Sequence, residues 1–156
     1  MIEIAKYLAL VALLGTAVVF GTDVFCALVQ RPALAAVDDR ALVAVMGNVH
    51  RYGDQRMPIP GVIGMVAAAA SAVLAAVAGH WVQAIPAAAA LTLLLIWLVV
   101  YLRISAPINR QLTAASNAGT VPSNARALQS NWDRVINTRA VLQGLAVVGL
   151  SLSLLL

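Results

Sequence analysis

Four stretches of this chain are each apolar over roughly the 20 residues that a helix needs to cross a bilayer. They cover about residues 4–29, 58–78, 82–102 and 138–156. With 62% of its residues hydrophobic and 10% charged, the chain has more apolar surface than a soluble domain of this size can bury. The sequence therefore predicts an all-α integral membrane four-helix bundle, built from a single domain that comprises residues 1–156.

The first and fourth stretches differ in length from the other two. The first runs past the length of a secretory signal core, and no small-x-small cleavage site precedes Asp23, so we expect an uncleaved helix. The fourth is short for a span, so we expect its helix to begin earlier, near Asn131, with polar first turns.

An amphipathic helix is predicted between the first two spans. Asp38 and Asp39 are candidate N-terminal caps of this helix. The apolar residues that follow recur at helical spacing, which predicts one buried face made of Leu42, Val45, Met46 and Val49.

Turn signals mark the other links. Pro58 and Pro60 suit the first turn of a helix better than its interior, so the second span should begin there. The link around residues 79–81 is so short that the second and third spans must form an antiparallel hairpin. Residues 117–124 are rich in turn formers, and Ser123 or Asn124 can cap the helix that follows.

The basic residues indicate how the protein is oriented. All nine arginines lie in the two long links or at their edges, and Lys6 alone lies toward the opposite side. The positive-inside rule then predicts that both long links are cytoplasmic and both termini outside, in the bacterial inner membrane. The net charge of +4 does not indicate a nucleic-acid partner, because the basic residues are single and flank apolar runs.

Asp23 is a costly residue inside the first predicted span. A carboxylate at that depth costs on the order of 3 kcal/mol, and the partly negative C-terminal end of the helix repels it further. Asp23 therefore needs a cation, and Arg139 and Arg103 are the candidates. The pair would either fix the register of the helices or take part in catalysis or ligand binding.

His50 and Asp54 are spaced i, i+4 and so lie on the same side of the amphipathic helix. The spacing suits a carboxylate that orients an imidazole, or two metal ligands on one face. The alternative is a histidine that merely lies at the membrane–water interface. His80, beside Trp81 on the opposite side of the membrane, is expected to be interfacial in that way.

A further set of residues can line a polar pocket at the arginine-rich end of the bundle. Trp132 and Arg139 lie two helical turns apart on one face, and Asn109 follows Pro107 near the end of the third span. The alternative is that Trp132 anchors its helix at the interface and that the arginines meet lipid phosphates. The candidate binding residues are Arg31, Tyr52, Asp54, Arg56 and Trp132.

Several classes of protein are excluded by what the sequence lacks. It has no Walker loop, dinucleotide fingerprint, metalloprotease helix or serine nucleophile elbow. Its spans carry no row of charges such as a voltage sensor or a proton pump needs. Two histidines on opposite sides of a membrane cannot ligate one haem from both faces.

One combination of motifs resembles a known family. The third span ends in Ser105-Ala106-Pro107-Ile108-Asn109-Arg110, and after a loop Trp132 and Arg139 precede an apolar fourth span. The first helix is followed by Arg31-Pro32-Ala33-Leu34 and an amphipathic helix. Over nearly the whole chain this pattern resembles the anthrone-oxygenase-like membrane family, a widespread group of four-helix proteins, most of them without an assigned function.

For fungal members, the resemblance implies oxidation of an anthrone to an anthraquinone by dioxygen. The residues that match the family by position and type are Asn109, Trp132 and Arg139. The chain departs from the pattern at Ile136, where members often have Asn or His, and Asn137 would point about 100° elsewhere on the helix. The fungal substrate therefore does not carry over by analogy alone.

Two functions follow as hypotheses. The first is a membrane-bound oxidoreductase or oxygenase that acts on a flat lipophilic aromatic, such as a quinol, entering from the bilayer. Asp23 or His50 would remove a proton, and Arg139 with Asn109 would stabilise the phenolate or enolate. The second is a non-enzymatic binder of a small ligand or lipid, or an accessory subunit of a membrane complex.

The sequence does not define a cofactor or an assembly. The protein binds either no cofactor or a single metal ion held by His50 and Asp54, and one histidine provides few ligands for a metal. A transporter is the least favoured reading, because four helices lack the paired broken helices that transporters use. A homo-oligomer would supply them.

Overall fold

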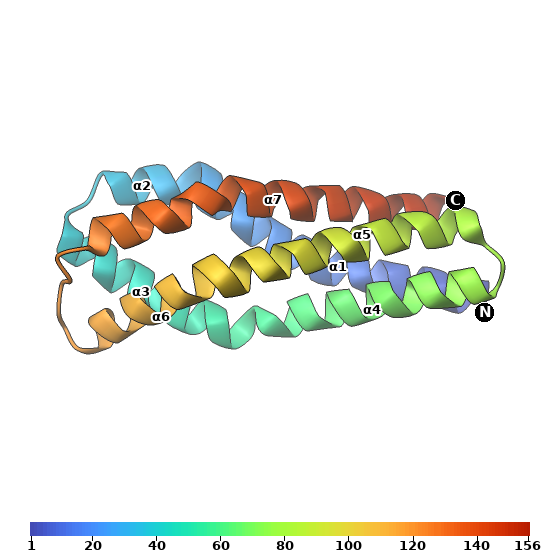
Figure 1. Ribbon diagram of the computed structural model, residues 1–156, viewed down its shortest axis with the longest axis horizontal. Coiled ribbons are helices and arrows are strands. Elements are labelled where there is room, and N and C mark those ends of the chain that lie inside the picture. Colours follow the sequence, from blue (N-terminus) through green and yellow to red (C-terminus); the bar gives the residue numbers. More distant parts are fainter.

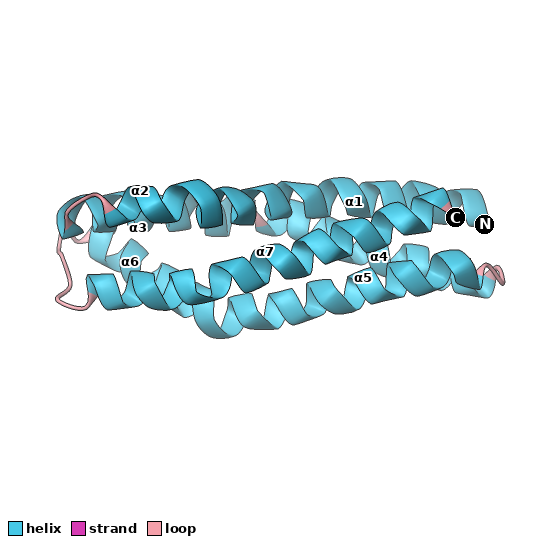
Figure 2. Ribbon diagram, turned by 90° about the horizontal axis from the view of Figure 1, so that it is seen from above, coloured by secondary structure: helices cyan, strands magenta, loops and turns pink.

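Helices account for nearly all of the chain. A computed structural model describes all 156 residues and contains no strand, which confirms the all-α prediction. Figure 2 shows the longer loops at the two ends of the molecule. The elements in chain order are α1 (Ile2–Phe25), η1 (Cys26–Gln30), α2 (Arg31–Ala35), α3 (Asp39–Arg56), α4 (Pro58–Val77), α5 (Trp81–Val100), η2 (Tyr101–Ser105), α6 (Ala106–Asn117) and α7 (Ala125–Leu155).

Four helices are long and apolar enough to cross a membrane: Ile2–Ala35, Pro58–Val77, Trp81–Asn117 and Ala125–Leu155. They lie lengthwise beside one another, with both termini and the α4–α5 link at one end of the bundle (Figure 1). The opposite end contains α2, α3, α6 and the start of α7. The protein is therefore an integral membrane protein whose helices continue past the predicted spans.

Two π-helical segments, η1 and η2, make this continuation possible. Each is followed by a proline at the second position of the next helix, Pro32 in α2 and Pro107 in α6. A proline ring in a regular helix clashes with the carbonyl group four residues earlier. The wider π turn relieves that clash, so the first helix runs on to Ala35 and the third to Asn117 instead of ending near residues 29 and 102.

The bundle is longer than a bilayer is thick. α4 has 20 residues and so spans about 30 Å, the thickness of a hydrocarbon core. α1 runs alongside it from Ala5, whose carbonyl accepts from Ser71 Oγ at 2.8 Å, to Val19, which packs near Gly61. The segments beyond this level form what we call the cap, which consists of α2, α3, α6 and residues 125–138 of α7.

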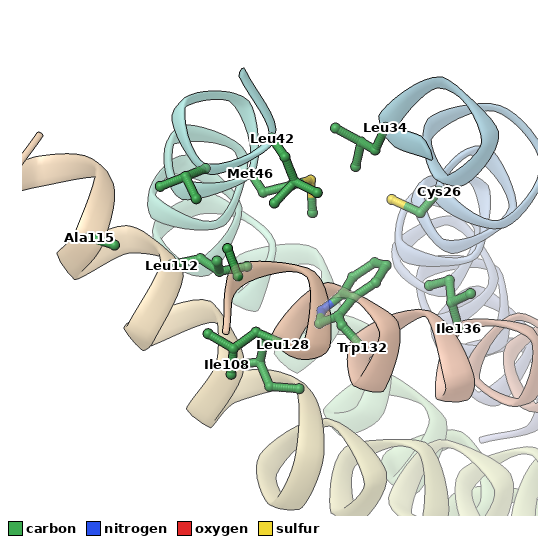
Figure 3. Close-up of a cluster of buried hydrophobic side chains, with 12 residues drawn as sticks. Cys26, Leu34, Leu42, Met46, Ile108, Leu112, Ala115, Leu128, Trp132 and Ile136 are labelled. Carbon is green, nitrogen blue, oxygen red and sulfur yellow. The ribbon is translucent and has the colours of Figure 1, made fainter. Parts of the chain in front are cut away.

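The cap has a hydrophobic core of its own, in which α3 packs chiefly against α6. The buried residues of α3 include Leu42, Val43 and Met46. The predicted apolar face is therefore wrong for Val45 and Val49, which are 47% and 40% exposed. Figure 3 shows how α3, α6, α7 and the end of the first helix contribute to this core, whose members include Cys26, Leu34, Leu42, Met46, Ile108, Leu112, Leu128 and Trp132.

Most helix ends agree with the sequence-based expectations. Asp38 caps α3 by accepting the Ala41 N–H at 2.7 Å, α4 begins at Pro58, and a short link forms the α4–α5 hairpin. Asp39 is the first helical residue rather than the cap. α7 begins at Ala125, well before Asn131, and its cap residue Asn124 makes no side-chain capping bond, so the predicted cap is wrong.

Gly47 allows α3 to approach α6 closely. A Cβ atom at this position would lie 2.2 Å from Ser116 Cβ and 2.7 Å from the Leu112 carbonyl oxygen. We expect Gly47→Ala to lower the free energy of unfolding by about 1 to 3 kcal/mol through overpacking. The matched control is Gly53→Ala on the same helix, where nothing lies within 4 Å of the added carbon. Thermal unfolding measures both; an equal response of the two variants would contradict the predicted contact.

Candidate functional site

A buried ion pair lies where the membrane-spanning part of the bundle meets the cap. Arg139 Nη2 donates to Asp23 Oδ1 at 2.6 Å, and the two residues are only 6% and 1% exposed. Trp97 Nε1 donates to Asp23 Oδ2 at 2.9 Å, and Arg139 Nη1 donates to Ser105 Oγ at 2.9 Å. Of the two predicted partners of Asp23, Arg139 is the one used, and Arg103 is exposed.

Three aromatic rings surround the guanidinium group of Arg139. Its central carbon lies 5.4 Å from the ring centroid of Trp97, 5.6 Å from that of Tyr101 and 5.3 Å from that of Trp132. Trp97 and Tyr101 stack with ring centroids 5.6 Å apart. A desolvated cation over an aromatic face gains about 2 kcal/mol or more, so the rings help to offset the cost of burying Arg139.

A second network connects these aromatics to α3. Tyr101 Oη and Asn109 Nδ2 both donate to Asp54 Oδ1, at 2.7 and 2.8 Å. Trp132 Nε1 donates to Asn109 Oδ1 at 3.0 Å. Both ends of the Asn109 amide therefore make a hydrogen bond, and Asn109 holds Asp54 and Trp132 in place.

His50 is the group in this region with an uncommitted ring nitrogen. The side chain is 4% exposed, its ring lies 5.5 Å from that of Trp132, and its buried Nε2 has no hydrogen-bond partner. Burial lowers the pKa of His50 to about 4; Asp54 opposes this effect and Arg139 reinforces it. The imidazole is consequently neutral near pH 7. No hydrogen bond joins it to Asp54, so the predicted orienting role of that carboxylate is wrong.

A cavity of about 130 Å³ brings most of the predicted site residues together. Its walls are partly apolar, with Val19, Cys26 and Leu98 among them. Thr22 on the first helix and Val49 on α3 also line it and are exposed, so the cavity reaches the bundle surface between these two helices. The predicted residues that line it are Asp23, His50, Asp54, Asn109, Trp132 and Arg139.

Three predicted binding residues lie elsewhere. Tyr52 is 47% exposed, and the guanidinium carbon of Arg56 lies 5.2 Å from its ring centroid, on the outside of α3. The i, i+4 rule that pairs His50 with Asp54 turns Tyr52 and Arg56 away from the cavity. Arg31 lines a separate groove between α2 and α7.

The residues present fit a metal ion poorly. No group of three or more His, Cys, Asp or Glu side chains able to hold a metal ion is found. His50 and Asp54 alone fall short of the three or four protein ligands typical of such sites. Asp54 Oδ1 also already accepts two hydrogen bonds. The predicted pair of metal ligands therefore lacks the support of further donors.

Sequence reasoning missed three residues of the third span. Trp97, Tyr101 and Ser105 follow one another at intervals of four, so they lie on one helical face. That face meets Arg139 in the structure. The signal was present in the sequence, because polar-tipped side chains at helical spacing near the end of a span need buried partners.

Comparisons with models of protein families, with curated proteins and with solved structures found no match to this chain. The cavity combines a neutral histidine with a free nitrogen, a buried cation and walls that are partly apolar.

Removing one partner of the buried ion pair should be strongly destabilising. Arg139→Gln leaves the Asp23 carboxylate buried without a cation, which we expect to lower the free energy of unfolding by about 3 to 5 kcal/mol. The double variant Asp23→Asn with Arg139→Gln should regain part of that loss, because no charge stays buried. Arg134→Gln, at an exposed position of the same helix, is the control. Denaturant titration in detergent measures all of them; additive losses in the double variant would contradict the pairing.

The buried neutral His50 should make stability depend on pH. Its pKa is about 4 in the folded protein against 6.5 for a free histidine, so the unfolded chain binds the proton more tightly. Folding stability is then full above pH 6.5 and declines as the pH falls toward 4, by about 3 kcal/mol at most. In His50→Gln this part of the decline should vanish from thermal unfolding curves, whereas His80→Gln should keep it. A wild-type slope in His50→Gln would contradict the assignment.

Proposed function

We propose that this protein is a membrane-bound oxidoreductase that takes the phenolic or quinol-like ring of a lipophilic molecule into the cavity. The observation that carries the proposal is His50, whose buried Nε2 has no partner within the protein and which lines a cavity beside a buried guanidinium. A pKa of about 4 makes His50 a weak base, so transfer of a proton from a ring hydroxyl group to it depends on Arg139 stabilising the phenolate.

Asp23, His50 and Arg139 would have different roles in such a reaction. Asp23 is not assigned the proton transfer, because both of its oxygens already accept hydrogen bonds from Arg139 and Trp97. His50 would accept the proton, and the resulting phenolate would lie near the Arg139 guanidinium, which stabilises negative charge. Arg139 Nε is buried without a partner and supplies a free N–H donor on the same side chain.

Dioxygen is the proposed oxidant, in line with the resemblance to the anthrone-oxygenase-like family. A quinol loses two electrons and two protons to become a quinone, and dioxygen takes them up as hydrogen peroxide. For an anthrone, dioxygen supplies the new carbonyl oxygen and its second oxygen atom leaves as water with the two hydrogens of the methylene group. Both reactions begin with removal of a proton, the step assigned to His50.

The size of the cavity supports a substrate that inserts one ring. Its volume is about 130 Å³, close to the cavity of about 150 Å³ that accommodates benzene in an engineered protein. A fused system such as an anthrone would extend out of the opening between Thr22 and Val49. That opening lies beside Asp23 and the first residue of α4, at the proposed end of the hydrocarbon core.

The proposed setting is the bacterial inner membrane. All nine arginines lie in the cap or where the cap meets the spans, and the positive-inside rule supports a cytoplasmic cap with both termini outside. A substrate would then enter from the cytoplasmic leaflet.

A second candidate, a non-enzymatic ligand binder, is favoured by one observation. Asp23, Asp54, Asn109 and Trp132 each make at least one side-chain hydrogen bond inside the protein, as in a structural core. In that case a lipophilic phenol would bind the cavity without being converted.

Oxygen uptake distinguishes the two candidates. We expect the protein in nanodiscs to consume dioxygen with a quinol or an anthrone, and His50→Gln to lower the rate by about 100-fold or more, the usual contribution of a general base. His80→Gln is the matched control, because His80 is exposed at the other end of the bundle. Since His50 works in its neutral form, the rate should hold to about pH 5 and fall near pH 4. Binding of the phenol without oxygen uptake would favour the binder, and equal rates in the two histidine variants would contradict the role of His50.

A further inference from the structure

A second groove lies on the outside of the cap, between α2 and the first half of α7, and has a volume of about 640 Å³. It shares no lining residue with the cavity. Three ionisable side chains are available in it, Arg31, Asp133 and Arg134. Figure 1 shows α2 and the start of α7 at the same end of the bundle.

Arg126, the fourth ionisable side chain of the groove, is committed to holding the cap together. Its Nε pairs with Asp39 at 2.6 Å, Nη1 donates to the Leu34 carbonyl at 2.9 Å, and Nη2 donates to the Val37 carbonyl. These bonds hold the end of α2 and the following turn against α7. Arg126 is therefore not free to bind a ligand.

Arg31 and Arg134, in contrast, make no hydrogen bond or ion pair within the protein, and both are exposed. Asp133 accepts a hydrogen bond from Gln129 Nε2 at 2.9 Å, which leaves lone pairs on its carboxylate unused. Leu34 and Ala35 add an apolar part to the lining. The groove thus offers two free cations and one anion around a partly apolar surface.

The two free arginines lie at the outer edge of the lipid headgroup layer and just beyond it. With the end of the hydrocarbon core taken at the level of Asp23 and Arg139, Arg134 is five residues beyond Arg139, or about 7 Å, and Arg31 is eight beyond Asp23, or about 12 Å. The headgroup layer is about 5 to 8 Å thick on each side. The long arginine side chains can extend from these positions back into that layer.

We infer that this groove binds one phospholipid with an ethanolamine headgroup. Its phosphate group would accept from the guanidinium groups of Arg31 and Arg134, and its ammonium group would donate to Asp133. This headgroup matches the sign of all three charges, whereas a glycerol headgroup offers Asp133 no ammonium group. The inference does not depend on the proposed redox function, because no cavity residue takes part.

Native mass spectrometry of the purified protein, titrated with phosphatidylethanolamine or phosphatidylglycerol, tests this inference. We expect the wild type to retain the ethanolamine lipid more tightly. Arg31→Gln with Arg134→Gln should weaken its retention by about 30-fold, since each arginine near the lipid surface contributes about 1 kcal/mol. The control with equal charge is Arg51→Gln with Arg110→Gln, which removes two exposed arginines from the groove between α3 and α6.

Asp133→Asn separates recognition of the headgroup from general attraction to phosphate. It keeps an oxygen that can accept from Gln129 but removes the negative charge, so the preference for ethanolamine over glycerol should disappear while phosphate binding persists. An unchanged preference in Asp133→Asn would overturn the ammonium assignment. Equal loss of lipid in the two double-arginine variants, or no loss in either, would overturn the groove as the binding site.

Discussion

The buried ion pair between Asp23 and Arg139 is the interaction on which the arrangement of this bundle depends. Desolvating the two charges costs several kcal/mol for each, so the folded state is stable only if the pair and its surrounding hydrogen bonds form together. The pair joins the first and last helices, and Trp97 and Ser105 tie the third helix to it. The depth and geometry of the pair thus fix the register of three of the four membrane-spanning helices.

The position of the cavity follows from how the chain crosses from the membrane to the cap. Pro32 and Pro107 each follow a π segment, in the first and third of the long helices. The chain also breaks at Met57, between α3 and α4. Regular helix packing is therefore interrupted at three places near the same level of the bundle. In the cap, α3 packs on α6 rather than on the first helix, so a gap opens beside the ion pair.

Sequence patterns predicted the large-scale structure well because it depends on apolar length and on proline position. They also identified Arg139 as a candidate partner for Asp23, since an unpaired charge in a span is costly. They failed where tertiary contacts override local preference. Helical spacing placed Val45 and Val49 in the core, yet α3 turns Val43 and Gly47 inward because Gly47 fits against Ser116. Tyr52 and Arg56 were grouped with the site by chain proximity alone.

The cation that stabilises the fold also acts on His50, the base proposed for the reaction. His50 is neutral because burial removes its hydration, and the nearby charge of Arg139 adds to that effect. A carboxylate in its place would instead form a second ion pair with the guanidinium, as Asp23 does. A neutral imidazole next to a fixed cation keeps a free lone pair and gains an electrostatic partner as soon as a proton moves and an anion forms. Arg139 thus serves both the buried ion pair and the proposed chemistry.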